Sequence, residues 1–174
     1  MKLLPFFIFL TLVIGCSDIN PVKPTEDYYK GKVAVLLEDS TSIEDVNNLL
    51  SSFDYISIDR INSFQYYSDF PIDSAQTILL AFESKQYLQN TTTDVVNING
   101  QSKLLIDFWL TNFTSEDIQD WSKTKTRFKL THNPHYGQIG TLGVEEGQEK
   151  EWVNILSNSK LFKVVELDYI YYTH

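Results

Sequence analysis

Two histidines that lie three positions apart are the side chains best placed to do chemistry together. His132 and His135 bracket Asn133-Pro134, so both imidazoles can reach one metal ion from a single turn. A structural zinc site takes four protein ligands and a catalytic zinc site three, and the sequence marks no third ligand beside this turn. We therefore favour two exposed turn histidines, and we expect no metal site and no cofactor.

A cluster of carboxylates is the second group that can do chemistry. It precedes and enters a helical pattern near the C-terminus, and a carboxylate pair there can supply general acid and base catalysis. Acidic residues are, however, common in the first turn of a helix, because they interact favourably with the helix dipole. The sequence also contains no G-x-S-x-G, H-E-x-x-H, P-loop or G-x-G-x-x-G motif. We therefore expect a protein that is not an enzyme. The clustered residues are Glu145, Glu146, Glu149 and Glu151.

Composition sets the broad class of the chain. Its 174 residues allow one ordinary domain or two small ones, and a hydrophobic content of 43% is enough for a packed core. The formal net charge is −9, and no cluster of Lys and Arg interrupts that acidity. Because nucleic acid binding depends on cationic clusters, nucleic acid is not expected as a partner.

The N-terminus has the organisation of a processing signal. Lys2 supplies a short basic region, and residues 3–14 form an apolar run. That run is too short to cross a bilayer, which takes about 20 residues. Residues 13–16, Val-Ile-Gly-Cys, close the run and resemble the lipobox of bacterial lipoproteins. The resemblance implies a signal peptide over residues 1–15 and a lipid-modified Cys16 as the first residue after cleavage.

The lipobox also implies where the protein works. Acyl chains on Cys16 would anchor it to a membrane without a spanning helix, in the bacterial cell envelope and outside the cytoplasm. The sequence leaves the leaflet open. Cys16 is the only cysteine, which excludes an internal disulfide and a C-x-x-C site. Residues 16–31, with Pro21 and Pro24, are expected to form an extended tether.

The first folded region is predicted over residues 32–100. Residues 33–37 are a continuous apolar run, typical of a buried strand, and residues 43–53 have a helical apolar face behind N-cap candidates at 39–42. The order of elements predicted here is β-α-β-β-α-β. The later elements of the region are a strand at 55–61, a loop at 62–76, a strand at 77–82, a short helix at 84–89 and a strand at 94–98.

The same order recurs over residues 101–174, after a turn signal at 99–102 that we take as the domain boundary. Both regions then match the ferredoxin-like βαββαβ arrangement, and the predicted fold is α+β with two such units in tandem. The predicted elements are a strand at 103–110, a helix carrying Ile118 and Trp121, strands at 127–131 and 139–144, a helix carrying Trp152, Ile155 and Leu156, and a strand at 164–172.

The C-terminal region from Leu104 to His174 resembles the subtilisin propeptide and peptidase inhibitor family. Residues 143–152, GVEEGQEKEW, are similar to the strand, acidic glycine turn and helix start of that family. Residues 164–170, VVELDYI, look like its closing strand. In the family, cleavage falls about six residues after the aspartate of that strand, and the sequence ends six residues after Asp168.

This resemblance implies a function and a set of binding residues. The protein would be an inhibitor, or a folding helper, of a subtilisin-like serine protease. Glu166 and Asp168 would accept hydrogen bonds at the N-termini of two protease helices. The last residues would enter the substrate cleft as a product does, with the carboxylate of the final residue beside the catalytic serine. Those residues are Tyr171, Tyr172, Thr173 and His174.

The sequence is also compatible with a second function. The chain can instead be a non-catalytic envelope lipoprotein that docks another protein through its sheets, with no protease involved. In that case Glu166 and Asp168 are solvated strand residues, and residues 169–172 pair inside the fold. The two alternatives differ in whether the C-terminal residues are exposed or buried in a sheet.

Overall fold

The computed structural model describes residues 27–135 and 137–170. Within them the chain forms one antiparallel sheet of seven strands, four α-helices and one short 3₁₀ helix, which confirms the predicted α+β class. None of the described helices is long and apolar enough to cross a membrane. The predicted signal peptide and Cys16 lie outside the described residues. The elements are β1 (Tyr28–Leu37), α1 (Ile43–Ser52), β2 (Ser57–Ser68), η1 (Ile72–Ser74), α2 (Ala75–Glu83), β3 (Leu88–Ile98), β4 (Gln101–Thr111), α3 (Ile118–Arg127), β5 (Leu130–His132), β6 (Ile139–Gly143), α4 (Glu149–Ser157) and β7 (Phe162–Tyr169).

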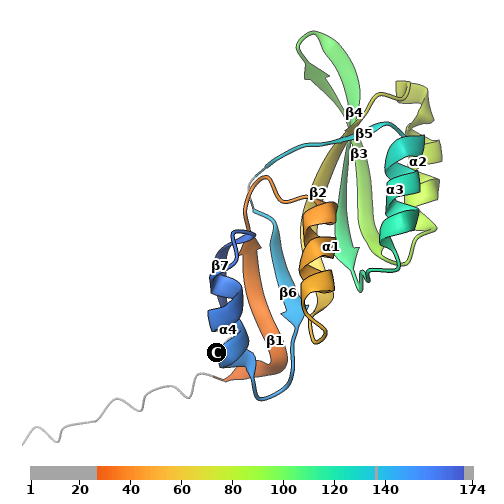
Figure 1. The fold of residues 1–174 in the computed structure, drawn as a ribbon. Coiled ribbons are helices and arrows are strands. Elements are labelled where there is room, and N and C mark those ends of the chain that lie inside the picture. The colour runs from red at the N-terminus through yellow and green to blue at the C-terminus, as the bar shows by residue number, and fades with distance from the viewer. Residues whose placement is uncertain (1–26, 136, 171–174) are drawn as a thin grey trace, which may run out of the picture.

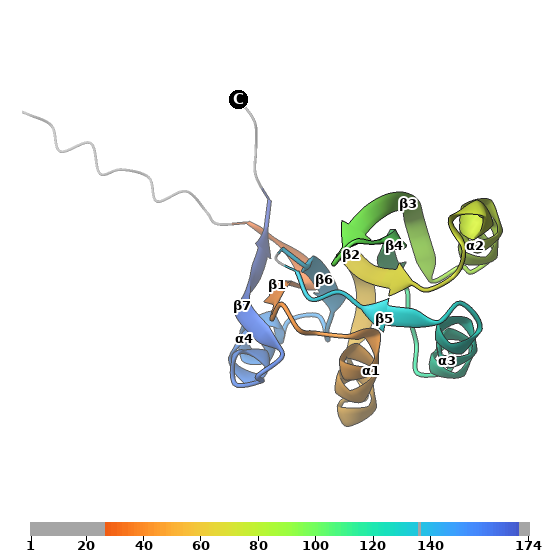
Figure 2. The ribbon, with the colours of Figure 1, turned by 90° about the horizontal axis from the view of Figure 1, so that it is seen from above.

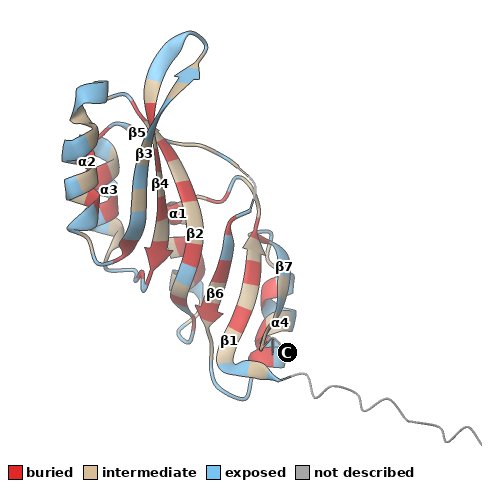
Figure 3. Cartoon of the chain, turned by 180° about the vertical axis from the view of Figure 1, so that it is seen from behind, coloured by how far each residue is buried: buried red, intermediate tan, exposed pale blue. Residues whose placement is uncertain are grey.

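The strands follow the order β3-β4-β2-β6-β1-β7, and β5 pairs separately with β2. Figure 1 shows α1, α3 and α4 in front of the sheet, with α2 beside α3. Seen from above, the sheet runs from β7 at one edge to a curled β3 and β4 at the other (Figure 2). The opposite face of the sheet, turned to the viewer in Figure 3, is not covered by any of the described helices. We call this side the open face.

Two ferredoxin-like units are present, and they share a strand. The outer unit consists of β1, α1, β2, β6, α4 and β7, and its strands lie in the order β7-β1-β6-β2. The inserted unit consists of β2, α2, β3, β4, α3 and β5, and its strands lie in the order β5-β2-β4-β3. In both, the fourth strand lies next to the first and the third lies next to the second, with every neighbouring pair antiparallel, as in a ferredoxin-like unit.

The predicted division at residues 100 and 101 therefore falls inside one unit. Asn99 and Gly100 are the two central residues of the β3–β4 hairpin, with Ile98 paired to Gln101 across the turn. Both have positive φ angles, of 52° and 82°, which Asn-Gly adopts readily in two-residue hairpin turns. Asn99 and Gly100 do form a turn, as predicted, but this turn joins two paired strands and does not separate two domains. The units are nested and not in tandem.

Three predicted elements were wrong for local reasons. Residues 77–82, predicted as a strand, belong to helix α2, in which Ile78 and Phe82 are buried one turn apart and Leu80 is 57% exposed. A short apolar run does not distinguish a helix from a strand by periodicity. Residues 84–89, predicted as a short helix, form the turn after α2 and the first two residues of β3. Residues 62–68, predicted as part of a loop, belong to β2.

Strand β2 departs from simple alternation, because it contains bulges. Its buried residues are Ile58, Ile61, Phe64, Tyr66 and Ser68, at spacings that a flat strand would place on both faces. Register shifts lie between Ile58 and Arg60 in the pairing with β6, and between Ile61 and Phe64 in the pairing with β4. Each bulge adds a residue and turns the next side chain back toward the helices. The bulges thus keep all five side chains in the core.

The core under the helices is continuous across both units. In the inserted unit it is aromatic: the ring of Tyr66 lies 5.9 Å from that of Phe108 and 5.0 Å from that of Trp121. In the outer unit it is mainly aliphatic, closed by an edge contact between Phe53 and Trp152 at 5.5 Å. The shared strand lies between the two parts, so neither unit has a complete core without β2.

The nested topology predicts that the C-terminal half does not fold alone. A fragment of residues 102–174 lacks β1 and β2, which flank β6, and β1 is also the strand to which β7 pairs. We expect circular dichroism and amide NMR spectra of an unfolded chain, whereas residues 27–170 should give dispersed spectra and cooperative unfolding. Cooperative thermal unfolding of the 102–174 fragment would contradict the shared-strand arrangement.

Candidate functional site

The open face of the outer unit carries Glu166 and Asp168, two of the six residues predicted to bind a protease. Val33, Val35 and Leu37 of β1 are buried under the helices, so the alternating residues of the same strand face the other way. Ala34 lies opposite Glu166 on β7. Glu166 therefore lies on the open face, and Asp168, two residues further along β7, shares it.

An apolar group lies beside these acids on the open face. Leu36 pairs with Ile139 on one side and with Val164 on the other, so the three side chains form a row across β6, β1 and β7. Ile139 is 56% exposed and Val164 45% exposed. We call this row the apolar triad. Together with Glu166 and Asp168 it gives the β7 side of the open face a mixed apolar and acidic surface.

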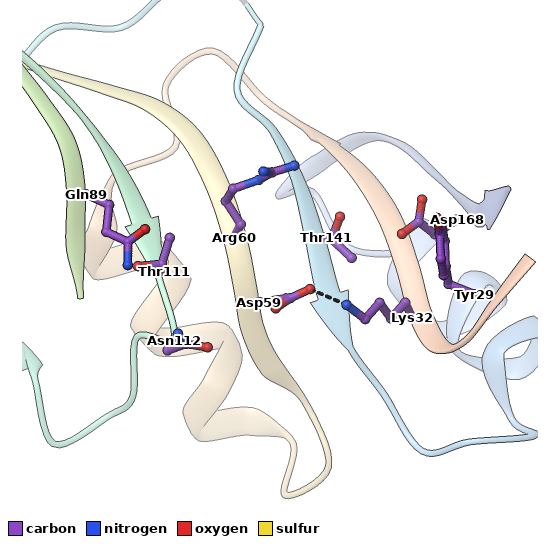
Figure 4. Close-up of a pocket in the computed structure, with 9 residues that line it drawn as sticks. All are labelled: Tyr29, Lys32, Asp59, Arg60, Gln89, Thr111, Asn112, Thr141 and Asp168. Carbon is purple, nitrogen blue, oxygen red and sulfur yellow. Dashed lines mark hydrogen bonds and ion pairs between the residues drawn. The ribbon is translucent and has the colours of Figure 1, made fainter. Parts of the chain in front are cut away.

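A polar groove of about 350 Å³ crosses the sheet at the Asp168 end of this surface (Figure 4). Its lining comes from β7, β1, β6, β2, β4 and β3 in turn, so it spans both units. The lining includes two cations and two carboxylates as well as amides and hydroxyls. The residues are Tyr29, Lys32, Asp59, Arg60, Gln89, Thr111, Asn112, Thr141 and Asp168.

Lys32 and Asp59 form the fixed ion pair of the groove. The Nζ atom of Lys32 donates to a carboxylate oxygen of Asp59 at 2.6 Å. This hydrogen bond is the main cause that raises the pKa of Lys32, and the charges of Asp59 and Asp168 add to it against partial burial. Lys32 therefore remains charged at neutral pH, and it links β1 to β2 across the shorter strand β6, which lies between them.

The predicted protease-binding residues fall into two groups. Glu166 and Asp168 lie on β7, an edge strand of the sheet, and share the open face. Tyr171, Tyr172, Thr173 and His174 lie outside the described residues. Up to that point the strand is held in place, because Tyr169 pairs with Tyr28 and the amide of Ile170 donates to the carbonyl oxygen of Asp27 at 2.8 Å.

The two histidines occupy separate structural environments. Both are half-buried, so the expectation of exposed turn residues was wrong. His132 ends β5 with its ring 5.2 Å from that of Tyr66, and burial is the main cause that lowers its pKa. The ring nitrogens of His135 lie within hydrogen-bond distance of Asn133 O and of Ser63 Oγ. Within the described residues no three His, Cys, Asp or Glu side chains are grouped to hold a metal ion.

Glu149, a member of the carboxylate cluster, has a structural role. Its side chain is 1% exposed, and one carboxylate oxygen accepts hydrogen bonds from the amides of Gly31 at 2.6 Å and Gly147 at 3.0 Å. These bonds tie the start of α4 to β1. The bond from Gly31 is the largest cause that lowers the pKa of Glu149, followed by the bond from Gly147. A buried carboxylate that accepts two backbone hydrogen bonds stabilises the fold and is not available for proton transfer.

The sequence did not identify the groove residues of β2. Asp59 and Arg60 lie within the β2 bulges, where alternation gives no reliable face, and the pairing of β2 with β6 joins residues more than 70 positions apart. The only feature of the sequence that marks this part of the groove is the adjacent charged pair Asp59-Arg60. Comparison with known proteins adds no further assignment: no family model, no curated protein and no solved structure matches the chain.

Glu149→Gln should destabilise the fold in a pH-dependent way. Because the folded-state pKa is lowered, the charged carboxylate contributes stability above its unfolded pKa of about 4.3, and this contribution is lost as pH falls through the lower folded-state pKa. We expect a loss of about 1–3 kcal/mol in unfolding free energy at pH 7, and a smaller loss at pH 3, measured by urea denaturation.

Glu151→Gln is the matched control for this prediction. Glu151 lies in the same helical turn, is exposed, and its side chain makes no hydrogen bond to any described residue. Its substitution should change the unfolding free energy by less than about 0.5 kcal/mol. Equal losses for Glu149→Gln at the two pH values, or equal losses for the two variants, would rule out the proposed role of the Glu149 carboxylate.

Proposed function

We propose that the chain is a lipid-anchored, extracytoplasmic inhibitor, or folding helper, of a subtilisin-like serine protease. One observation carries the proposal. Glu166 and Asp168 share the open face of β7, which is the last strand of a ferredoxin-like unit and an edge of the sheet. The strand therefore presents two acids to a partner and leads directly to the C-terminal residues.

The topology supports the resemblance while changing its extent. The two segments that resemble subtilisin propeptides are consecutive in the outer unit: residues 143–152 run from the end of β6 into α4, and residues 164–170 cover most of β7. The first half of that unit comes from β1, α1 and β2, and not from residues 104–131 as the sequence suggested. The unit that resembles the propeptides is thus built from the first and last elements of the described residues.

Binding in this proposal uses the open face of the outer unit. The apolar triad supplies surface that loses water on contact, and Glu166 and Asp168 accept hydrogen bonds from free amides at helix N-termini of the protease. An anion at a helix N-terminus is stabilised by roughly 0.3–2 kcal/mol. None of the helices in residues 27–135 and 137–170 covers the face, so a partner can approach this part of the protein without moving a helix (Figure 3).

The C-terminal residues would complete the complex. Tyr171 to His174 would add to the substrate cleft as an extended strand, with main-chain hydrogen bonds and alternating side-chain pockets. The carboxylate of His174 would lie beside the catalytic serine and its oxyanion hole, as a product carboxylate does. Because β1 holds β7 extended up to Ile170, less conformational entropy is lost on binding. The alternative function, docking of another envelope protein, would use the open face but not these four residues.

Inhibition assays with residues 17–174 and a broad-specificity subtilisin test the proposal. Glu166→Ala with Asp168→Ala should raise the inhibition constant at least about tenfold, since two helix N-termini lose their anions. Deletion of residues 171–174 should abolish inhibition. Glu151→Ala removes an exposed acid on the helical side and should leave inhibition unchanged.

The outcomes separate the two functions. Inhibition that depends on Glu166, Asp168 and the last four residues supports the product-like complex. If the folded protein does not inhibit, or inhibits equally well without residues 171–174, the protease proposal fails and the docking alternative is favoured.

Lipid anchoring is tested independently of the partner. In a bacterial host, Cys16→Ser should remove the acyl-modified N-terminal peptide from the mass spectrum and release the protein from the membrane fraction. Serine has no thiol group to which the lipid can be attached. Ser17→Ala keeps the cysteine and should be lipidated normally. Membrane association of Cys16→Ser equal to that of the unaltered chain would contradict the lipoprotein assignment.

A further inference from the structure

Arg60 is a cation of the open face that has no anionic partner in the part of the chain that the structure describes. Its side chain is exposed, and its guanidinium carbon lies 5.2 Å from the centroid of the Trp109 ring. Among the described residues no carboxylate lies within ion-pair distance of it. The other cation of the groove, Lys32, is already paired with Asp59. Arg60 is therefore the groove's available positive charge.

The surroundings of Arg60 are rich in neutral hydrogen-bonding groups. Thr111 is its register partner on β4, and Gln89, Asn112 and Thr141 also line the groove, with the Arg60 side chain turned toward β6 and Thr141 (Figure 4). The hydroxyl of Thr111 is buried and has no hydrogen-bond partner within the described residues. Buried hydroxyls normally find a hydrogen-bond partner, which at a groove wall is either a water molecule or a group that enters the groove. Asp59, the nearest acid in the sequence, has its carboxylate on Lys32.

We infer that the Arg60 end of the groove binds a carboxylate presented by the protein that docks on the open face. An arginine stacked on an aromatic ring is held in place with its planar fork of N–H donors free, and that fork matches a carboxylate in a bidentate geometry. Gln89, Asn112 and the two threonines supply hydrogen-bonding groups along the rest of the groove.

Charge favours a carboxylate over a phosphate as the occupant. A phosphate group would bring about two negative charges into a groove that also holds Asp59 and Asp168. One carboxylate balances one guanidinium without that excess. The docked partner would then present a carboxylate to Arg60 and hydrogen-bond donors to Glu166 and Asp168. Opposite charges at the two ends of one face determine the orientation of the partner as well as its affinity.

The identity of the protein that presents the carboxylate rests on the proposed function. Binding of a carboxylate at Arg60 does not, and it can be tested without a protease. The probe is N-acetyl-glutamate N-methylamide, titrated into ¹⁵N-labelled residues 17–174. We expect chemical shift changes at the Arg60 Nε–H and the Trp109 indole N–H. The glutamine analogue of the probe, which has the same shape without the charge, should give no shift, and inorganic phosphate should bind more weakly.

Arg60→Gln should weaken probe binding about five- to tenfold or more, and Thr111→Val by a smaller factor. The sequence contains one other arginine, and it provides a matched control. Arg127 also stacks on an aromatic ring, with its guanidinium carbon 4.9 Å from the centroid of Phe128, but it lies on α3. Arg127→Gln should leave binding unchanged. Arg60→Lys keeps the charge without the fork and should bind with intermediate affinity, provided that its spectrum elsewhere matches the unaltered protein.

Probe shifts that are lost in Arg60→Gln and kept in Arg127→Gln support the inference, whether or not any protease is inhibited. Absence of shifts up to the solubility limit of the probe overturns it, even if protease inhibition is strong. Equal shifts with the glutamine analogue, or equal loss in the two arginine variants, also overturn it. Failure of this inference and failure of the proposed function are thereby distinguishable.

Discussion

The arrangement of the molecule depends on the pairing of β6 with β2. Strand β6 is only five residues long, yet it lies between β1 and the bulged half of β2 and so joins the β1–β7 edge of the sheet to the shared strand. The approach is close: a Cβ on Gly140 would lie 2.7 Å from both the carbonyl oxygen of Arg60 and the Cγ1 atom of Ile61. Glycine at this position lets the short strand sit against the bulge.

That pairing also positions the candidate site. The bulges keep Ile58, Ile61 and Phe64 in the core, and the residues between them, Asp59 and Arg60, line the groove on the open face. From there Lys32 connects Asp59 to β1, and β1 holds β7 at the edge of the sheet. A single surface is in this way assembled from strands far apart in the sequence. It has acids and the apolar triad at the β7 side and an available guanidinium over the shared strand.

Local signals were readable from the sequence, and long-range pairings were not. The helix predicted at 43–53 is observed as α1, whose first amides are satisfied by a capping box between Ser42 and Asp45, and Glu166 and Asp168 do share one face of a strand. The Asn-Gly turn predicted a reversal but could not show that the strands on either side are neighbours. The nesting of the two units depends on which strands lie beside β2. That pairing depends on the β2 bulges and on the close approach of Gly140, and neither produces a periodic pattern in the sequence.

We propose that a protease docks on the open face of the outer unit and on the residues that follow β7. Amide hydrogen exchange of residues 17–174, with and without a subtilisin whose catalytic serine is replaced by alanine, tests this most directly. We expect slower exchange along β7 and residues 171–174 in the complex, with α2 and α3 unaffected. Slower exchange confined to the helices, or no change at any amide at saturating protease, would contradict it.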